Sequence, residues 1–315
     1  MSSTVTVKQR IQSWQWAISA GVCGYLALGV ATHTVKTYHW FLLLLIPTTF
    51  RLAERGRQFF LDWSPLFACW LIYDRFRLVQ PYLLDRVAVE SVYQLERWLF
   101  GWMAGGEIPA HVARAWLAAH AGEPLWASFS WLMQVIYLSH LFYVPPILYY
   151  WWRQGRKDQE ARARFTRHIR AFTALHLLGF AVYLLLPVAP PWWISLHGMA
   201  QPSADLLAQT NIALGMDGVI VRSTIKTAPN WFAAVPSLHG AYPVLLALFA
   251  LRSRRWLMLA LVSMYGALMW TATVVLNQHY IADLLAGAAL AVVSYWLCGG
   301  ERTVFSQFRR STENL

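Results

Sequence analysis

The stretch Pro236–Gly299 reads PSLHGAYPVLLALFALRSRRWLMLALVSMYGALMWTATVVLNQHYIADLLAGAALAVVSYWLCG. It divides into three apolar runs: Pro236–Leu251, Trp256–Leu276 and His279–Gly299. Each run approaches or reaches the length of about 20 residues that a helix needs to cross a bilayer. The breaks between them are very short, so the stretch predicts consecutive membrane-spanning helices.

The rest of the chain has the same character. Of its 315 residues, 57% are hydrophobic and 13% are charged, whereas soluble domains carry about 25% charged residues. Five further apolar runs are candidate spans: Trp14–Thr32, Tyr38–Phe50, Phe59–Tyr73, Trp126–Trp152 and Ile169–Ala189. The second and third of these are short for a full crossing, so we expect them to be tilted, extended by their flanking residues or a re-entrant pair. We therefore predict an all-α, polytopic transmembrane helical bundle with six to eight spans.

The segment Asp74–Pro124 is amphipathic and is not apolar enough to cross a bilayer. Apolar residues recur at helical spacing from Leu84 to Leu99 among charged ones, which predicts a helix lying in the membrane interface as a lid or platform. The stretch Gly101–Pro109 breaks this helix, and His111–His120 is expected to form a second, shorter one.

The net charge of +11 is distributed in a way that indicates topology. Basic residues cluster in short segments between or beside apolar runs: Lys8–Arg10, Arg51–Arg57, Arg153–Arg170, Arg252–Arg255 and Arg302–Arg310. Cytoplasmic loops of membrane proteins carry such an excess. This distribution argues against nucleic acid as a partner. It predicts an integral membrane protein with cytoplasmic N- and C-termini, and with the loops 74–124 and 190–235 on the extracytoplasmic or lumenal side.

Two histidines stand at the starts of two apolar runs on that outer side. His239 follows Pro236-Ser237, and His279 begins the last run. We expect each in the first turn of a helix, where free backbone N–H groups and the helix dipole favour an anion. Asp283 follows His279 by four residues, so it is expected one turn along the same face, within reach of that imidazole.

These groups predict phosphoryl transfer. Asp283 would fix the tautomer of His279 and leave its Nε2 nucleophilic, so that a phosphohistidine forms. His239 would act as general acid and then general base, and the Ser237 hydroxyl would bind a phosphate oxygen. In the simpler alternatives, the histidines are buried core residues and Ser237 only caps its helix. A metal site would need a further ligand that no spacing supplies, so no metal and no other cofactor is expected.

Two blocks resemble the type-2 phosphatidic acid phosphatase superfamily. They are Ala233-Ala234-Val235-Pro236-Ser237-Leu238-His239 and His279 to Asp283, followed by Gly287. They are most similar to its inositol phosphorylceramide synthase-like, or inositolphosphotransferase, branch. Further similarity lies in Tyr137–His140, Ala189–Trp193 and Glu96–Gly101. The resemblance implies His279 as nucleophile, Asp283 as its partner and His239 as acid and base.

The chain departs from the superfamily pattern in its phosphate ligands. Thr273 stands where the family has a phosphate-binding arginine, and no first motif with Lys and Arg-Pro is found. Positive charge for the phosphate must then come from elsewhere. The candidates are Arg222 and Lys226 in the loop before Pro236, and Arg75 at the start of the interfacial segment.

The sequence thus predicts a phosphotransferase whose partners are membrane lipids: a phospholipid or lipid-phosphate donor and a lipid alcohol acceptor. A lipid phosphate phosphatase would use the same residues with water as acceptor. A transporter with a His/Asp proton relay is the non-enzymatic alternative. We expect one membrane domain with N-terminal spans and interfacial helices in 1–125, a catalytic core in 126–299 and a cytoplasmic tail in 300–315. The oligomeric state is not predicted.

Overall fold

The computed structural model describes residues 2–140, 142–213 and 225–298, and within them every regular element is helical. The chain forms two compact units, Met1–Leu71 and Ile72–Leu315. The expectation of an all-α chain is confirmed. The domain boundaries at 125 and 299 stay a prediction.

The first unit contains a long helix, α1 (Ser2–Ala31), whose stretch Ser13–Ala31 is apolar enough to span a membrane. A short 3₁₀ helix, η1 (Thr37–Leu44), leads into α2 (Leu45–Asp74). The Gln15 side chain donates a 3.1 Å hydrogen bond to the carbonyl oxygen of Thr49, which ties α1 to the start of α2. The two short apolar runs are not separate helices: α2 contains the end of Tyr38–Phe50, the basic segment Arg51–Arg57 and all of Phe59–Tyr73, and η1 contains the rest of the first run.

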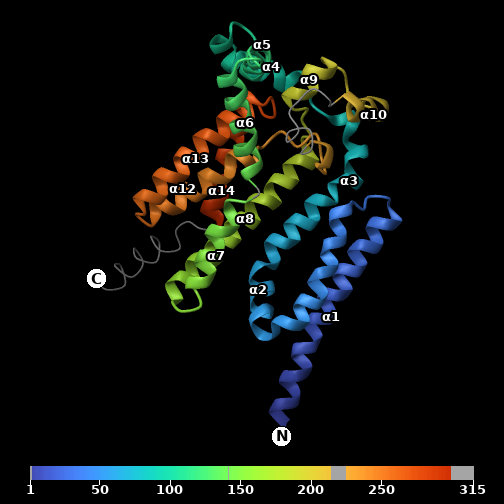
Figure 1. Cartoon of the computed structure of the whole chain (residues 1–315), viewed down its shortest axis with the longest axis vertical. Coiled ribbons are helices and arrows are strands. Elements are labelled where there is room, and N and C mark those ends of the chain that lie inside the picture. The colour runs from blue at the N-terminus through green and yellow to red at the C-terminus, as the bar shows by residue number, and fades with distance from the viewer. Residues whose placement is uncertain (1, 141, 214–224, 299–315) are drawn as a thin grey trace, which may run out of the picture. The chain divides into compact units, whose positions relative to one another are not determined.

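The second unit is built around six helices that form a bundle (Figure 1). They are α6 (Pro124–Ser139), α7 (Val144–Gln154), α8 (Gln159–Leu185), α12 (Leu238–Arg252), α13 (Trp256–Val275) and α14 (Ile281–Cys298). Helix α12 packs against both α13 and α14, and α8 covers α14. This arrangement brings the beginnings of α12 and α14 together.

The number of spans is smaller than predicted when it is judged by length and composition. In the described part of the chain, α1, α8, α13 and α14 meet both criteria, and a fifth span results if α6 and α7, bent by 41°, count as one. Helix α12 is apolar but shorter. The predicted six to eight spans are therefore not confirmed, although the polytopic architecture is.

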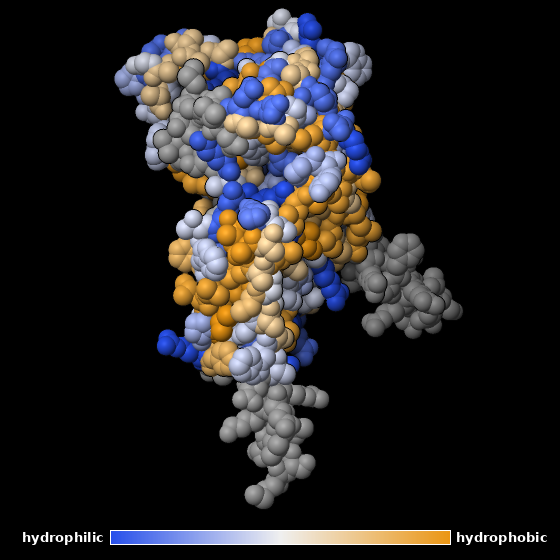
Figure 2. Space-filling model, turned by 90° about the vertical axis from the view of Figure 1, so that its right-hand side faces the viewer, coloured by the Kyte–Doolittle hydropathy of each residue, from blue (hydrophilic) through white to orange (hydrophobic). Residues whose placement is uncertain are grey.

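Large apolar side chains cover much of the outer surface. Trp131, Leu257, Leu261 and Trp296 each expose more than half of their area, and the space-filling view shows broad hydrophobic regions below a more hydrophilic upper end (Figure 2). Soluble proteins rarely expose such extensive apolar surface. The surface therefore fits a lipid environment, and the protein is an integral membrane protein.

Short helices gather at the end of the second unit where α12 and α14 begin (Figure 1). They are α3 (Phe76–Val79), η2 (Gln80–Arg86), α4 (Glu90–Phe100), η3 (Gly101–Ala104), α5 (Pro109–Ala119), α9 (Pro191–His197) and α10 (Ala204–Ala213). Helix α4 is amphipathic as predicted, with Tyr93 buried and Trp98 78% exposed. The predicted helix does not continue back to Leu84, because residues 87–89 are not helical.

Three non-helical segments lie side by side beneath these short helices. The Ala88 N–H donates to the carbonyl oxygen of Pro187 at 2.8 Å, and the Ala189 N–H donates back to that of Ala88 at 3.0 Å. The Val188 N–H donates to the carbonyl oxygen of Phe232 at 2.9 Å. These backbone bonds fix the course of the chain just before Pro236, where the first histidine motif begins.

Candidate active site

The Ser237 side chain starts helix α12. Its hydroxyl oxygen accepts a 3.3 Å hydrogen bond from the Gly240 N–H, as an N-cap residue does. His239 therefore lies in the first turn of the helix, as predicted. The Tyr183 hydroxyl donates to the carbonyl oxygen of Pro236 at 2.9 Å, so α8 also holds this turn.

His279 is positioned differently from the prediction. Helix α13 ends at Val275 and α14 begins at Ile281, so His279 lies in the connection and not in a first turn. The N–H groups of Gln278 and His279 both donate to the carbonyl oxygen of Thr273, at 2.8 and 3.2 Å. Asn277 adopts φ 61°, a left-handed conformation that asparagine tolerates better than most residues. This tight turn places the imidazole of His279 just before the N-terminus of α14.

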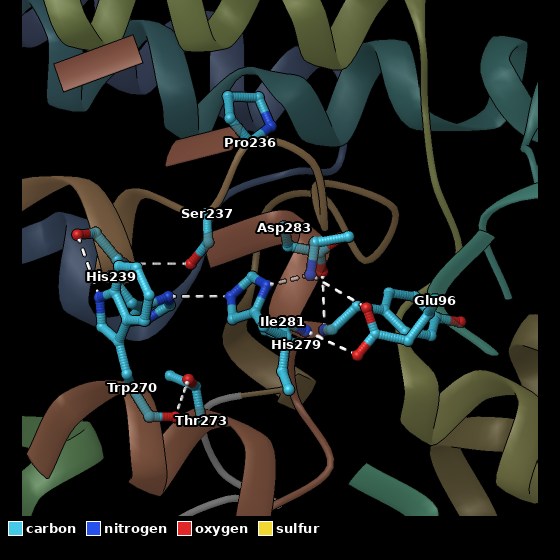
Figure 3. A network of polar contacts seen from close by, with 12 residues as sticks. Glu96, Pro236, Ser237, His239, Trp270, Thr273, His279, Ile281 and Asp283 are labelled. Carbon is cyan, nitrogen blue, oxygen red and sulfur yellow. Dashed lines mark hydrogen bonds and ion pairs between the residues drawn. The ribbon is translucent and has the colours of Figure 1, made fainter. Parts of the chain in front are cut away.

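The two histidines and Asp283 form one chain of polar contacts (Figure 3). The Nδ1 atom of His239 lies 3.0 Å from Nε2 of His279, and Nδ1 of His279 lies 3.2 Å from Oδ2 of Asp283. Asp283 is fully buried in the first turn of α14. If the carboxylate is ionised, Nδ1 of His279 carries the proton and donates to it. Nε2 of His279 then accepts from the Nδ1–H of His239.

Backbone contacts keep this chain of groups in place. The Ser237 N–H donates to the carbonyl oxygen of Asp283 at 3.0 Å, which joins the starts of α12 and α14 directly. The Tyr280 N–H donates to Oδ2 of Asp283 at 3.0 Å, so the same carboxylate oxygen serves both the backbone and the imidazole. Asp283 thus contacts the imidazole of His279 at Nδ1, and Nε2 on the opposite side of the ring faces His239.

Glu96 is a further member of the site whose role the sequence did not predict. Its carboxylate is fully buried and accepts from the N–H groups of Ile281 and Ala282, at 2.9 and 3.0 Å (Figure 3). Burial raises the pKa of this carboxyl group above its usual value, against the lowering effect of the two N–H donors. Glu96 lies three positions after the buried Tyr93 on α4. A charged residue on the apolar face of a helix was therefore the sequence feature that could have indicated a role for it.

Glu96 also changes the expectation for anion binding. The first N–H groups of α14 were expected to be free for a phosphate, but Glu96 and Asp283 already accept from those of Tyr280, Ile281 and Ala282. At the start of α12, the Gly240 N–H already donates to Ser237, so the N–H groups of Leu238 and His239 are the ones that we expect an anion to use.

Two further aromatic rings contact His239. The Tyr137 ring stacks on it at 4.9 Å between centroids, and the His140 ring meets it edge-on at 4.2 Å. Within the described residues, Nε2 of His239 is buried and has no hydrogen-bond partner. The sequence marked the stretch Tyr137–His140 only through its family resemblance, since no spacing rule connects it to His239.

The predicted phosphate ligands lie in different places. The Ser237 hydroxyl is buried in its capping contact, and Arg75 directly precedes α3. Lys226 is exposed. Arg222 lies outside the described residues. Thr273, at the position of the family arginine, is fully buried and its hydroxyl donates to the carbonyl oxygen of Trp270. The roles of these residues as phosphate ligands stay predictions.

Within residues 2–140, 142–213 and 225–298, no group of three or more His, Cys, Asp or Glu side chains is arranged to hold a metal ion.

The chain is similar to known proteins over most of its length. The sequence profile of the PAP2 superfamily matches residues 91–297. The phosphoinositol dihydroceramide synthase of Bacteroides thetaiotaomicron is 30% identical over 281 residues, which cover 87% of each chain. The inositol phosphorylceramide synthase of Candida albicans is 28% identical over 154 residues, which cover 46% of this chain and 30% of the fungal one. No solved structure gives a significant match.

Proposed function

The chain belongs to the PAP2 superfamily and is a membrane enzyme of the lipid phosphotransferase and phosphatase class; within that class, we propose that it transfers a phosphate-containing headgroup to a lipid alcohol through a phosphohistidine at His279. The chain of contacts from His239 through His279 to the buried Asp283 carries this proposal. It combines an oriented nucleophile with a second imidazole that can handle a proton.

In the first half-reaction, Nε2 of His279 attacks phosphorus and the bond from phosphorus to the glycerol oxygen of the donor breaks. The imidazole becomes cationic on phosphorylation, and Asp283, 3.2 Å from its Nδ1, stabilises that charge. His239 acts in its imidazolium form: it gives a proton to the departing oxygen and becomes neutral, so the diacylglycerol leaves as a neutral alcohol. The phosphoryl group must enter between the two imidazoles and replace their 3.0 Å contact.

In the second half-reaction, the hydroxyl of the acceptor attacks the phosphohistidine. His239, now neutral, accepts the hydroxyl proton as the new phosphorus–oxygen bond forms and the phosphorus–nitrogen bond breaks. Both imidazoles return to their starting protonation states. Because water could replace the alcohol, hydrolysis of a lipid phosphate is the competing outcome of the same site.

The names of the relatives suggest the substrates to test first. A relative that matches over most of both chains is a phosphoinositol dihydroceramide synthase, so phosphoinositol is our proposed headgroup and a dihydroceramide our proposed acceptor. We further propose that the site faces the extracytoplasmic or lumenal leaflet. The basic segments at the other ends of α8 and α12 support this orientation.

The test is a product assay with purified protein in detergent–lipid micelles. The donor is phosphatidylinositol with a labelled inositol, with and without dihydroceramide, and phosphatidic acid serves as a phosphatase substrate. A labelled sphingolipid that forms only with both lipids supports the proposal. Release of inositol phosphate or orthophosphate at the same rate with and without acceptor would instead establish hydrolysis. The His279→Ala variant is the control for contaminating enzymes.

A further inference from the structure

The end of the bundle away from the histidines contains a basic cavity of about 310 Å³. It lies between the start of α8 and the end of α12, and four arginines contribute to its wall against one glutamate. The charged lining residues are Glu160, Arg164, Arg167, Arg252 and Arg254. His168, Phe249 and Ser253 complete it.

Two arginines of the cavity lie within helix α8, whereas the positive charge that determines membrane topology is normally found in loops. Arg164 and Arg167 belong to the helix itself and are partly buried. Arg164 is paired with Glu160 at 2.5 Å. Arg167 lines the same cavity and shares with Arg164 the attraction of Glu160, the one acid of the cavity wall. Partly buried guanidinium groups that outnumber their counter-ions are costly, so an anion in the cavity would stabilise them.

An apolar groove of about 460 Å³ lies next to this cavity, between α7 and the start of α13. Pro146, Ile147, Leu257, Leu261 and Val262 are among the residues that line it. Trp151 connects the two features. The guanidinium of Arg164, which lines the basic cavity, lies 5.0 Å from the centroid of the Trp151 ring. The guanidinium of Arg255, which lines the apolar groove, lies 4.4 Å from it.

The basic cavity is too far from the histidines to hold the reacting phosphate. His239 is in the first turn of α12 and Arg252 is its last residue, and a helix rises about 1.5 Å per residue, so the two are about 20 Å apart. The cavity is therefore a separate site.

We propose that this end of the bundle binds an anionic phospholipid, with the phosphate among the arginines of the cavity and an acyl chain in the apolar groove. A basic cavity beside an apolar groove favours a lipid over a soluble phosphate ester, because a soluble ester would leave the groove empty. Basic pockets between transmembrane helices bind anionic headgroups in this way. The proposal does not depend on the reaction at His279.

The experiment is a lipid titration of the purified protein, followed by native mass spectrometry. The probes are dioleoyl phosphatidylglycerol, dioleoyl phosphatidylcholine with the same chains, and glycerol phosphate without chains. Arg167→Gln removes one of the four arginines of the cavity, and Arg170→Gln, an exposed arginine on the same helix that does not line the cavity, is its control. Leu261→Trp fills the groove, and Met264→Trp, an exposed residue of α13 outside it, is the second control.

We expect phosphatidylglycerol to bind more tightly than phosphatidylcholine, and Arg167→Gln to weaken its binding about tenfold, as loss of a charged hydrogen bond does. Leu261→Trp should also weaken it, whereas both control variants should bind as the wild type does. Unchanged affinity in Arg167→Gln overturns the proposal. Glycerol phosphate binding as tightly as phosphatidylglycerol overturns the assignment to a lipid. If the melting temperature shows that Arg167→Gln does not fold, the comparison of Leu261→Trp with Met264→Trp is the test: unchanged affinity in Leu261→Trp then overturns the proposal.

Discussion

Gly287 of α14 faces the carbonyl group of Ser237, and no space remains between them for a methyl group. A Cβ on Gly287 would overlap the carbonyl oxygen and lie 3.0 Å from the carbonyl carbon. The neighbouring contact, from the Ser237 N–H to the carbonyl oxygen of Asp283, fixes the same pair of helices. The separation of α12 and α14, and with it the distance between His239 and His279, therefore depends on a glycine one turn beyond Asp283.

The first prediction concerns Gly287→Ala. We expect activity to fall at least tenfold and unfolding to become about 1–3 kcal/mol easier, because a buried overlap with backbone forces the helices apart. Activity and melting temperature of the purified variant measure the two effects. Gly179→Ala is the control, since its added Cβ meets only the ends of two leucine side chains, Leu238 at 3.4 Å and Leu290 at 3.8 Å. A Gly287→Ala variant with wild-type turnover would mean that the spacing of the helices does not control the site.

The second prediction concerns the two imidazoles. His279→Ala should abolish turnover and His239→Ala should lower it by several orders of magnitude. The double variant should be little worse than His279→Ala, because the residues act as one unit. Rapid acid-free quenching with a phosphorus-labelled donor should trap an acid-labile phosphoenzyme in the wild type and none in His279→Ala. An acid-stable label that persists in His279→Ala would move the nucleophile to another residue, such as a serine.

The sequence predicted the parts of this site that are local in the chain. Ser237 as the residue before a helix, His239 in its first turn, and the contact of His279 with Asp283 all follow from short spacings. It misplaced His279 because the turn after Thr273 depends on backbone hydrogen bonds and on the left-handed Asn277, which no apolar period records. Glu96 is 185 residues before Ile281, and its contact arises only when α4 packs on α14.

The third prediction concerns the protonation of Glu96. Because burial raises its pKa in the folded protein above the usual value of 4.5, its contribution to the free energy of unfolding is complete below that value. The contribution is lost as the pH rises through the folded pKa. The melting temperature of the wild type minus that of Glu96→Gln should therefore decrease between about pH 4 and pH 8, the range in which a carboxyl group with a raised pKa loses its proton. Glu90→Gln, an exposed residue of the same helix, should show no such trend. A difference that increases with pH would show that the ionised carboxylate is the stabilising form.

The fourth prediction concerns metal ions and inhibitors. Transfer through His279, with N–H donors and basic side chains at the phosphate, needs no divalent ion, so we expect a chelator to leave the activity unchanged. Orthovanadate should inhibit, because its five-coordinate form resembles the phosphoryl transition state. Activity that disappears with a chelator and returns with one added divalent ion would contradict the proposed reaction. Steady-state rates with and without the chelator, in buffers of the same ionic strength, make this measurement.

The last prediction concerns the side of the membrane on which the histidines lie. The basic segment Arg153–Arg170 covers the end of α7 and the start of α8, whereas α9 and α10 lie at the end where α12 and α14 begin. If the basic end is cytoplasmic, a cysteine at Ser203 must react with an impermeant maleimide added outside intact cells, and a cysteine at Gln159 must not. Both positions are exposed, and the native Cys23, Cys69 and Cys298 are removed first. Permeabilised cells, in which both positions should react, control for access. Labelling at 159 alone would place His239 and His279 at the cytoplasmic leaflet, and the lipids available there would become the substrates to test.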